Sequence, residues 1–142
     1  MPLKIELKPG EKFIVNGAVI VAGRTGASLA LKNKAVLLRG RDVMQEAEAT
    51  TPARRLYFAL MLMYIDPDRH DEHRAAFNGF LADYTAATTL ALTRDRLRSI
   101  AELADSGAFY AGLKLCKELI AIEDGIMAPP RAPAALAAGE AR

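Results

Sequence analysis

The segment Ala49–Ile65 constrains the fold of this 142-residue chain more than any other stretch. Thr51 and Pro52 form a strong helix-start signal, because a threonine hydroxyl caps exposed N–H groups of the first turn and proline fits the first helical position. After a basic pair, Arg54 and Arg55, the segment is apolar on nearly every side. A helix of that character is buried all round. The sequence therefore predicts a central helix over residues 52–65, with strands on one flank and helices on the other.

Residues 3–39 show the alternation of apolar and polar side chains that is typical of strands. The dipeptide Asn16-Gly17 lies between two apolar runs and is a strong hairpin signal, because both central residues of a type I′ turn adopt positive φ. Turn sequences at residues 23–26 and 32–34 divide the rest. About five short strands indicate an antiparallel meander or small barrel. A unit of about 40 residues is marginal alone, so we expect support from the helices or from a second copy of the chain.

Three further helices are predicted after the central one, which ends at Pro67 because proline disfavours helix in the residue before it. Gly79 and the β-branched Thr85, Thr88 and Thr89 weaken the second helix and favour a kink or break in it. Thr93 is expected to cap the third helix, and Gly125 to end the fourth, whose buried stripe includes Tyr110. The predicted spans are residues 69–92, 94–106 and 108–121.

The fold class predicted from these elements is α+β, with an N-terminal antiparallel β-meander or small barrel followed by a bundle of about four helices. We expect a basic antiparallel β-module over residues 1–45 and a helical domain over residues 46–125. Residues 126–142 are rich in proline and alanine. They offer little to pack and are predicted to form a disordered tail.

Charge is divided unevenly along the chain. Residues 1–42 carry eight basic and three acidic side chains, whereas residues 43–142 carry eleven and fourteen. This asymmetry favours an anionic partner such as nucleic acid, with an ordinary solvated surface as the alternative. Phosphate contacts would make such binding dependent on salt. The candidate RNA-binding residues are Lys12, Arg24, Lys32, Lys34, Arg39, Arg41, Arg54 and Arg55.

Arg54 and Arg55 fall in the first turn of the central helix, where the helix dipole disfavours cations. They therefore predict an acidic partner or a bound anion, and a local ion pair with Glu46 or Glu48 is the simpler interpretation. Phe13 is the one aromatic residue of the strand segment, and its alternation places it inward. Base stacking of the kind used by single-strand RNA readers is therefore not expected from the strands.

The central helix also carries bulky, adaptable side chains. Methionine-rich stretches serve promiscuous interfaces, although such a run also suits a plain core. The candidate partner-binding residues are Tyr57, Phe58, Met61 and Tyr64.

No motif in the sequence indicates catalysis. There is no phosphate-binding glycine loop and no nucleophile with a histidine and acid around it. Cys116 lies in an apolar run and is expected to be a core residue. His70 and His73 share a helix face within an acidic cluster and offer a metal pair, although acids also suit the first turn of a helix. We expect no catalytic activity, no cofactor and no metal.

The N-terminus lacks the basic-then-apolar pattern of a signal peptide. No apolar run approaches the ~20 residues of a membrane helix. The expectation is a cytoplasmic protein without membrane contact.

Three stretches, Pro2–Phe13, Asn16–Ile20 and Ala49–Phe58, resemble the FlbT family, and the likeness extends to about Ile122. The resemblance implies a post-transcriptional regulator of flagellin synthesis that acts on the 5′ untranslated region of flagellin mRNA. It would couple translation or mRNA stability to flagellum assembly, and both repressors and activators occur in the family. The resemblance also implies the small protein FlaF as a partner, but it supplies no RNA-binding residues.

The segment Gly10–Gly17 is similar, over a short length, to CsrA, another regulator of mRNA leaders. CsrA-like chains pair strands between two subunits, which implies a homodimer here as a hypothesis. Two functions therefore stay open. One is an RNA-binding regulator with a basic β-surface, and the other is an adaptor or chaperone-like protein that binds flagellin or FlaF without reading RNA.

Overall fold

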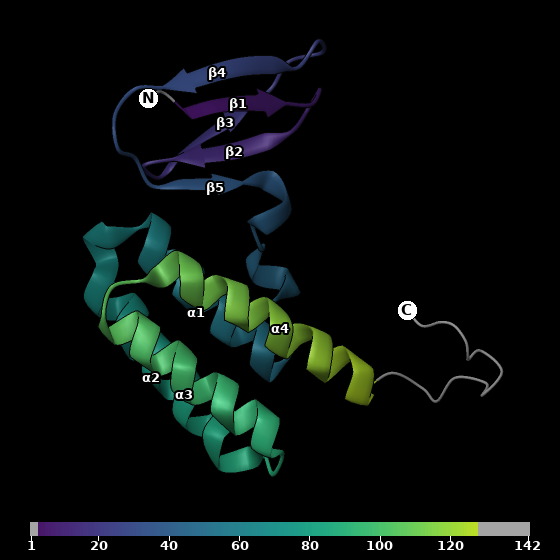
Figure 1. The fold of residues 1–142 in the computed structure, drawn as a ribbon, viewed down its shortest axis with the longest axis vertical. Helices are drawn as coiled ribbons and strands as arrows, with labels where there is room; N and C mark the ends of the chain where they lie inside the picture. The colour runs from purple at the N-terminus through teal and green to yellow at the C-terminus, as the bar shows by residue number, and fades with distance from the viewer. Residues whose placement is uncertain (1–2, 128–142) are drawn as a thin grey trace, which may run out of the picture.

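The computed structural model describes residues 3–127, and five strands precede four helices along the chain (Figure 1). This arrangement confirms the predicted α+β class. The strands are β1 (Leu3–Leu7), β2 (Lys12–Val15), β3 (Ala18–Val21), β4 (Ala27–Leu31) and β5 (Leu37–Arg39). The helices are α1 (Pro52–Ile65), α2 (His70–Ala87), α3 (Ala91–Asp105) and α4 (Phe109–Met127). Short 3-10 turns, η1 (Gly40–Asp42), η2 (Glu46–Glu48) and η3 (Pro67–Arg69), lie in the connections. Residues 128–142 of the predicted tail lie outside the described residues.

The strands form two antiparallel sheets, which together make the β-module. One sheet pairs β1 with β4, and the other has the order β3-β2-β5. The predicted hairpin is present between β2 and β3, with φ of 50° at Asn16 and 84° at Gly17. A small apolar core between the sheets contains Ile5, Leu7 and Phe13. The inward position predicted for Phe13 is therefore confirmed.

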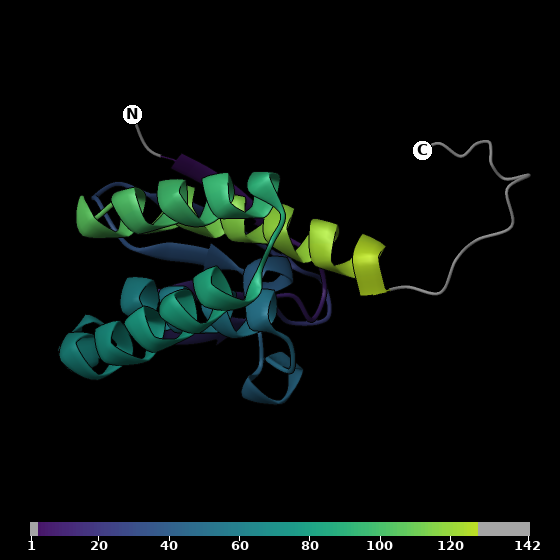
Figure 2. The same ribbon diagram turned by 90° about the horizontal axis from the view of Figure 1, so that it is seen from below.

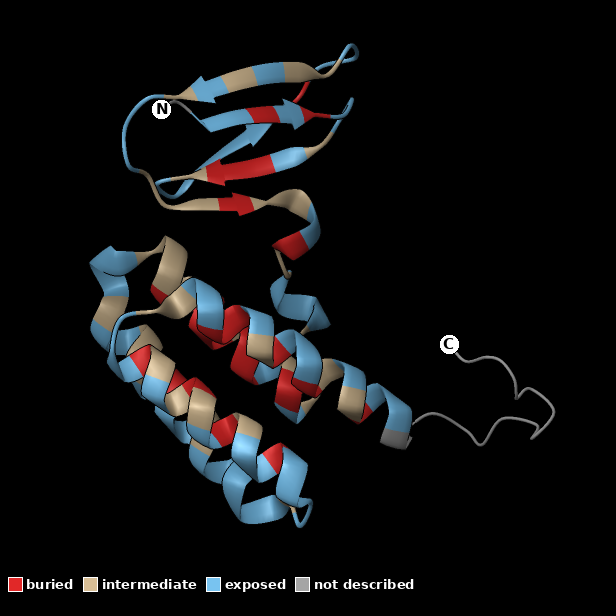
Figure 3. Ribbon diagram, viewed as in Figure 1, coloured by how far each residue is buried: buried red, intermediate tan, exposed pale blue. Residues whose placement is uncertain are grey.

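Helix α1 begins and ends where the sequence predicted. Thr51 Oγ1 accepts a hydrogen bond from the N–H of Arg54 at 3.3 Å, and proline occupies the first turn. The helix packs against both α2 and α4, and α4 packs in turn against α3, so the four helices form one bundle (Figure 2). Ile14 and Leu38, from the three-stranded sheet, belong to the same buried cluster as the helix side chains. The β-module therefore rests on the bundle through β2 and β5, where buried residues gather in Figure 3.

Two predicted boundaries of α2 and α3 are wrong. Helix α2 ends at Ala87, because Thr88 is extended, with ψ of 141°. Its hydroxyl accepts the N–H of Leu90 at 3.4 Å, which stabilises the break that the threonines favoured. Helix α3 then begins before Thr93, which is not a cap but a buried residue inside the helix.

Helix α4 continues past Gly125, where it was predicted to end. Near this end of the helix, Glu123 is a buried carboxylate that accepts the N–H of Ala53 at 3.0 Å and contacts Arg54 at 3.3 Å. An acid at the N-terminus of a helix satisfies an exposed N–H and suits the helix dipole. The contact spans 70 residues of sequence. Local signals could not reveal that it stabilises the last turns of α4.

Candidate functional site

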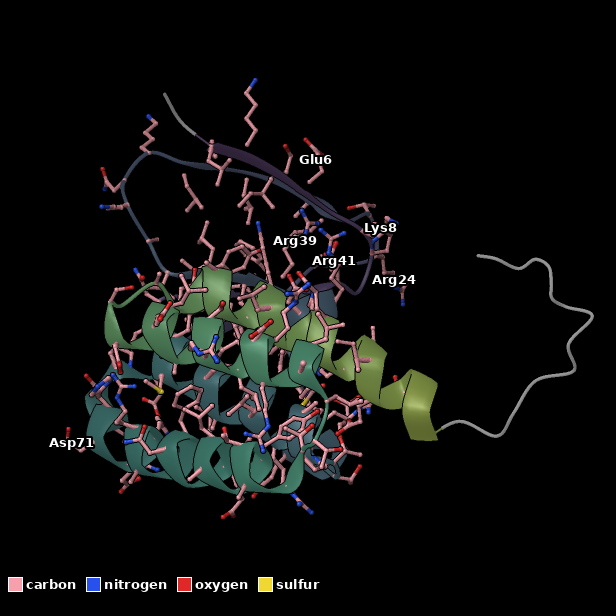
Figure 4. All side chains as sticks on the ribbon, turned by 60° about the horizontal axis from the view of Figure 1, so that its bottom comes forward. Glu6, Lys8, Arg24, Arg39, Arg41 and Asp71 are labelled. Carbon is pink, nitrogen blue, oxygen red and sulfur yellow. The ribbon has the colours of Figure 1, made fainter. Side chains whose placement is uncertain are left out.

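The basic side chains of the β-module lie at opposite ends of its strands. Arg24 lies between β3 and β4, and Arg41 follows β5; Figure 4 shows both toward one end of the module. Lys12 joins them, because its backbone packs against the residue before Arg41. Lys32 and Lys34 lie in the β4–β5 loop, at the other end of β4 (Figure 1). All five are exposed, and within residues 3–127 none makes an ion pair.

Arg39 is fixed by Glu11, in the β1–β2 connection, and by the backbone of β1. Its Nη2 donates to Glu11 Oε2 at 2.9 Å and to the backbone carbonyl of Glu6 at 2.7 Å. The backbone N–H of Lys8 also donates to Glu11, and this bond together with Arg39 lowers the pKa of the Glu11 carboxyl. Glu11 thus holds the Arg39 side chain in place and largely neutralises its charge. Lys12, Arg24 and Arg41, at the same end of the module, make no ion pair among the described residues and supply positive charge. We use the name basic end for Lys12, Arg24, Arg39 and Arg41.

A pocket of about 350 Å³ opens where the β-module meets the bundle. Tyr64, near the end of α1, and Tyr110, at the start of α4, lie there with ring centroids 5.9 Å apart. Lys114 Nζ lies 5.2 Å from the centroid of the Tyr110 ring. Tyr110 is 42% exposed. We call this the tyrosine pocket. It is lined by Leu3, Lys4, Ile5, Phe13, Leu37, Arg39, Tyr64 and Tyr110.

The tyrosine pocket combines groups that suit a flat aromatic ring joined to an anion. Tyrosine faces stack on nucleobases, and lysine and arginine bind phosphate. Arg39 is the residue that the pocket shares with the basic end, whereas Arg41 lines a separate pocket. Through Arg39 we treat the tyrosine pocket and the basic end as one candidate site. Single-stranded nucleic acid carries the matching chemistry, with bases for the pocket and phosphates for the basic end.

Tyr110 and Lys114 were missed as site residues from the sequence. The buried stripe predicted for their helix contained Tyr110, Leu113 and Cys116; Leu113 and Cys116 are buried, as predicted, but Tyr110 is 42% exposed. The spacing of Tyr110 and Lys114 places them on one helix face and was a usable signal. Their position beside the β-module depends on tertiary packing. The strands themselves offer no exposed aromatic ring among the described residues, but the helices supply two tyrosines.

Arg54 lines a further pocket together with Arg41 of the basic end, whereas Arg55 lines a different one. Arg54 forms two hydrogen bonds with Asp124, at 2.9 and 3.0 Å, in addition to its contact with Glu123, and Asp124 raises the pKa of Arg54. The predicted acidic partner is therefore on α4 and not in the linker. Arg55 is exposed and makes no ion pair within residues 3–127.

The four predicted partner-binding residues do not share one surface. Tyr57 is buried, and its hydroxyl donates to the backbone carbonyl of Asp42 at 2.6 Å; burial raises its pKa. Met61 is also buried and accepts a backbone N–H from the linker at 3.3 Å. Both side chains belong to the core and join the linker to α1. Phe58 and Tyr64 are half-buried and line separate pockets.

Phe58 lies in a second pocket, of about 390 Å³, between α1, α2 and the η2 turn. Its lining includes Leu62 and Phe80 and has one free cation among the described residues, Arg55. A smaller hollow containing Arg55, Phe80 and Tyr84 continues it along α2. We call the two together the α1–α2 groove. Its dimensions and apolar floor suit the apolar face of an amphipathic helix.

The described residues give little support to metal or thiol chemistry. Within residues 3–127, no group of three or more His, Cys, Asp or Glu side chains is placed to hold a metal ion. His73 Nε2 instead lies 2.9 Å from Asp66 Oδ2. Cys116 is buried, as predicted, and burial raises its pKa, so the reactive thiolate is disfavoured. The helices of the described region include none that is both long and apolar enough to cross a membrane.

A comparison with known proteins assigns this chain to a family. The family model described as "Flagellar protein FlbT" matches residues 3–127. The chain belongs to the FlbT family, as the sequence resemblance predicted. No solved structure matches the chain.

Relatives from three organisms carry names of one kind. The "Probable flagellum biosynthesis repressor protein FlbT" of Caulobacter sp. (strain K31) is 40% identical over 124 residues, covering 87% of this chain and 95% of the relative. The "Flagellum biosynthesis repressor protein FlbT" of Caulobacter vibrioides (strain ATCC 19089) is 38% identical, covering 87% and 88%. The "Probable flagellum biosynthesis repressor protein FlbT 1" of Bradyrhizobium diazoefficiens is 36% identical, covering 87% and 84%. These names describe regulators and not enzymes.

Proposed function

We propose that this protein regulates flagellar synthesis in the cytoplasm by binding single-stranded RNA at the tyrosine pocket and the basic end. Membership of the FlbT family and the repressor names of its relatives support the flagellar role. The target is the 5′ untranslated region of flagellin mRNA, as the family resemblance implies. The observation that supports RNA binding is that Tyr64, Tyr110 and Arg39 line one pocket.

In this proposal the two parts of the site have different tasks. A base stacks in the tyrosine pocket, where Tyr110 offers an exposed face. The neighbouring phosphates lie along Arg24 and Arg41, which have no acidic partner among the described residues. Stacking tolerates many bases, so preference for the flagellin leader comes from the shape of the unpaired segment that presents base and phosphates together.

Tyr110→Ala is expected to weaken RNA binding by about 5- to 150-fold, because a stacked base contributes about 1–3 kcal/mol. The measurement is fluorescence anisotropy of the full chain with labelled flagellin leader RNA and with an unrelated RNA of equal length. Tyr110 is exposed at the start of α4, so the fold should persist, and circular dichroism checks it.

The double variant Arg24→Glu with Arg41→Glu should lower the dependence of RNA affinity on salt. The slope of log affinity against log salt concentration should fall by about 0.7 for each phosphate that the protein no longer neutralises.

Arg98→Glu is the matched control, because Arg98 is an exposed arginine on α3 that pairs only with Asp95 among the described residues. It makes the same charge change per substituted residue, away from the site, and should leave RNA affinity nearly unchanged. Wild-type protein that binds the leader no better than the unrelated RNA at moderate salt would contradict direct readout. Unchanged affinity in a folded Tyr110→Ala variant would remove the tyrosine pocket from the site.

A second candidate function is a protein-binding adaptor, and the α1–α2 groove is the observation that favours it. The partners in question are FlaF and flagellin, which the resemblance implies. Phe80→Ala combined with Arg55→Glu should weaken capture of such a partner at least tenfold, because both side chains line the groove. Isothermal titration with purified FlaF and flagellin measures it, with Tyr110→Ala as the control in the other pocket. Binding that survives the groove variant would argue against this candidate.

A further inference from the structure

We propose that β3 is a dimerisation strand that pairs antiparallel with β3 of a second copy of this chain. The strand lies at the edge of its sheet, with the order β3-β2-β5. All four of its residues are exposed, and Val19 and Val21 are 62% and 58% exposed. It contains no charged residue. A flat, apolar, unguarded edge is what single domains normally avoid, because it templates pairing with another strand.

The hairpin fixes which backbone groups of β3 are free. In a two-residue hairpin the flanking residues form a hydrogen-bonded pair, and bonded pairs then alternate along the ladder. The N–H of Ala22 donates to the carbonyl of Glu11 at 2.9 Å, which agrees with this phase. Ala18, Ile20 and Ala22 therefore bond toward β2. The N–H and C=O groups of Val19 and Val21 point to the open edge.

These free groups select one register for a symmetric pair. Val19 of one copy lies opposite Val21 of the other, and the two residues exchange both hydrogen bonds, which gives four bonds across the two-fold axis. Ile20 then meets Ile20 of the second copy on the axis, in a pair of the closer, non-bonded kind. Beyond them, Ala18 faces Ala22.

Self-complementarity in this register identifies a second copy as the occupant. Apolar residues meet apolar residues, and small residues meet small ones, so no like charges oppose each other on the strand. Further out, Asn16 lies opposite Arg24, which adds no repulsion either. Among the other strands, β1 carries Lys4 and Glu6, and β5 carries Arg39. Strand β4 is also uncharged and has an open edge, but Ala27, Leu29 and Leu31 are partly buried against the core of the β-module, whereas all four residues of β3 are exposed.

The dimer would also stabilise the β-module, whose own core is small. Among the described residues, only Ile5, Leu7, Phe13 and Ala22 are buried in the core between the two sheets. Pairing at β3 creates one six-stranded sheet from two three-stranded sheets. Val19 lies opposite Ile14 on β2, which packs toward the helices, so both bundles lie on the same side of the joined sheet. Because the strand is only four residues long, we expect a dissociation constant on the order of micromolar.

Analytical ultracentrifugation of the full chain over low to high micromolar concentrations tests the pairing. Wild type should show a monomer–dimer equilibrium, and Val19→Lys with Val21→Lys should weaken it about 100-fold or more, because two lysines on each edge would face those of the other copy. Leu92→Lys is the control, since Leu92 is 50% exposed and lies on α3. A wild-type monomer throughout, or a dimer unaffected by the edge variant, overturns the proposal. Either result leaves the edge to another partner or to none.

A cross-linking experiment tests the register and does not depend on RNA binding. In a Cys116→Ala background, Ile20→Cys should form a reducible covalent dimer on mild oxidation, because the two sulfur atoms meet on the axis. Val19→Cys should not, since it faces Val21 of the other copy. Cross-linking by both variants equally, or by Val19→Cys alone, overturns the register. Failure of the edge variant to fold leaves this second measurement decisive.

Discussion

Replacing Phe77 with alanine should lower the free energy of unfolding by about 3–5 kcal/mol, the usual cost of emptying a buried phenylalanine site. Helix α2 spans 18 residues, all of them described, yet Phe77 is its one buried side chain, with 0% exposure. The rest of its apolar stripe, Phe80, Leu81 and Tyr84, is only partly buried. The packing of α2 onto α1 therefore depends strongly on this ring, and with it the α1–α2 groove.

Urea denaturation followed by circular dichroism measures the loss for Phe77→Ala. Phe77→Leu should cost less, about 1–2 kcal/mol, because it keeps most of the buried volume. Asn78→Ala is the control on the same helix, since Asn78 is exposed, and its effect should stay within about 0.5 kcal/mol. A loss below about 1 kcal/mol for Phe77→Ala would show that α2 is held mainly by its partly buried residues.

The elements that the sequence predicted best are those with local signals. Helix α1 matched residue for residue, because Thr51 caps it and Pro52 starts it within one turn of chain. The β2–β3 hairpin matched for the same reason, since Asn16 and Gly17 supply both positive-φ positions. In each case the physical cause lies within a few residues of the element.

The features that escaped prediction depend on contacts between distant segments. The pairing of β1 with β4 skips two strands, so turn signals could not reveal it. The last turns of α4 are held by the hydrogen bond that Glu123, on α4, accepts from the N–H of Ala53 at the start of α1. Tyr110 became a site residue only because α4 begins beside the β-module. Sequence spacing gives the elements, but their packing decides which side chains meet.

The basic residues show the same limit. Eight of them were grouped from composition and position, and the structure separates them. Arg54 is matched by Asp124, Arg39 by Glu11, and Lys32 lies at the opposite end of β4 from Arg24. Net charge predicts the sign of a partner, whereas ion pairing within the chain decides which cations are free to meet it.

Replacing Gly26 with alanine should destabilise the protein by about 3 kcal/mol or more, the second large effect expected here. Gly26 has φ of 75°, a left-handed conformation that costs an alanine about 1–2 kcal/mol. A Cβ atom there would also lie 2.4 Å from the backbone carbonyl oxygen of Leu7. Because that oxygen belongs to the end of β1, the clash must displace backbone and not a flexible side chain.

Gly10→Ala is the matched control, because Gly10 has nearly the same φ, 74°, and no atom within 4 Å of an added Cβ. It should cost only the conformational part, about 1–2 kcal/mol, so the difference between the two variants measures the clash alone. Equal losses in urea denaturation would show that the β3–β4 turn moves away from β1 at no cost. The same turn carries Arg24. The folded Gly26→Ala variant should therefore also bind RNA more weakly than wild type, and Gly10→Ala should weaken RNA binding less than Gly26→Ala does.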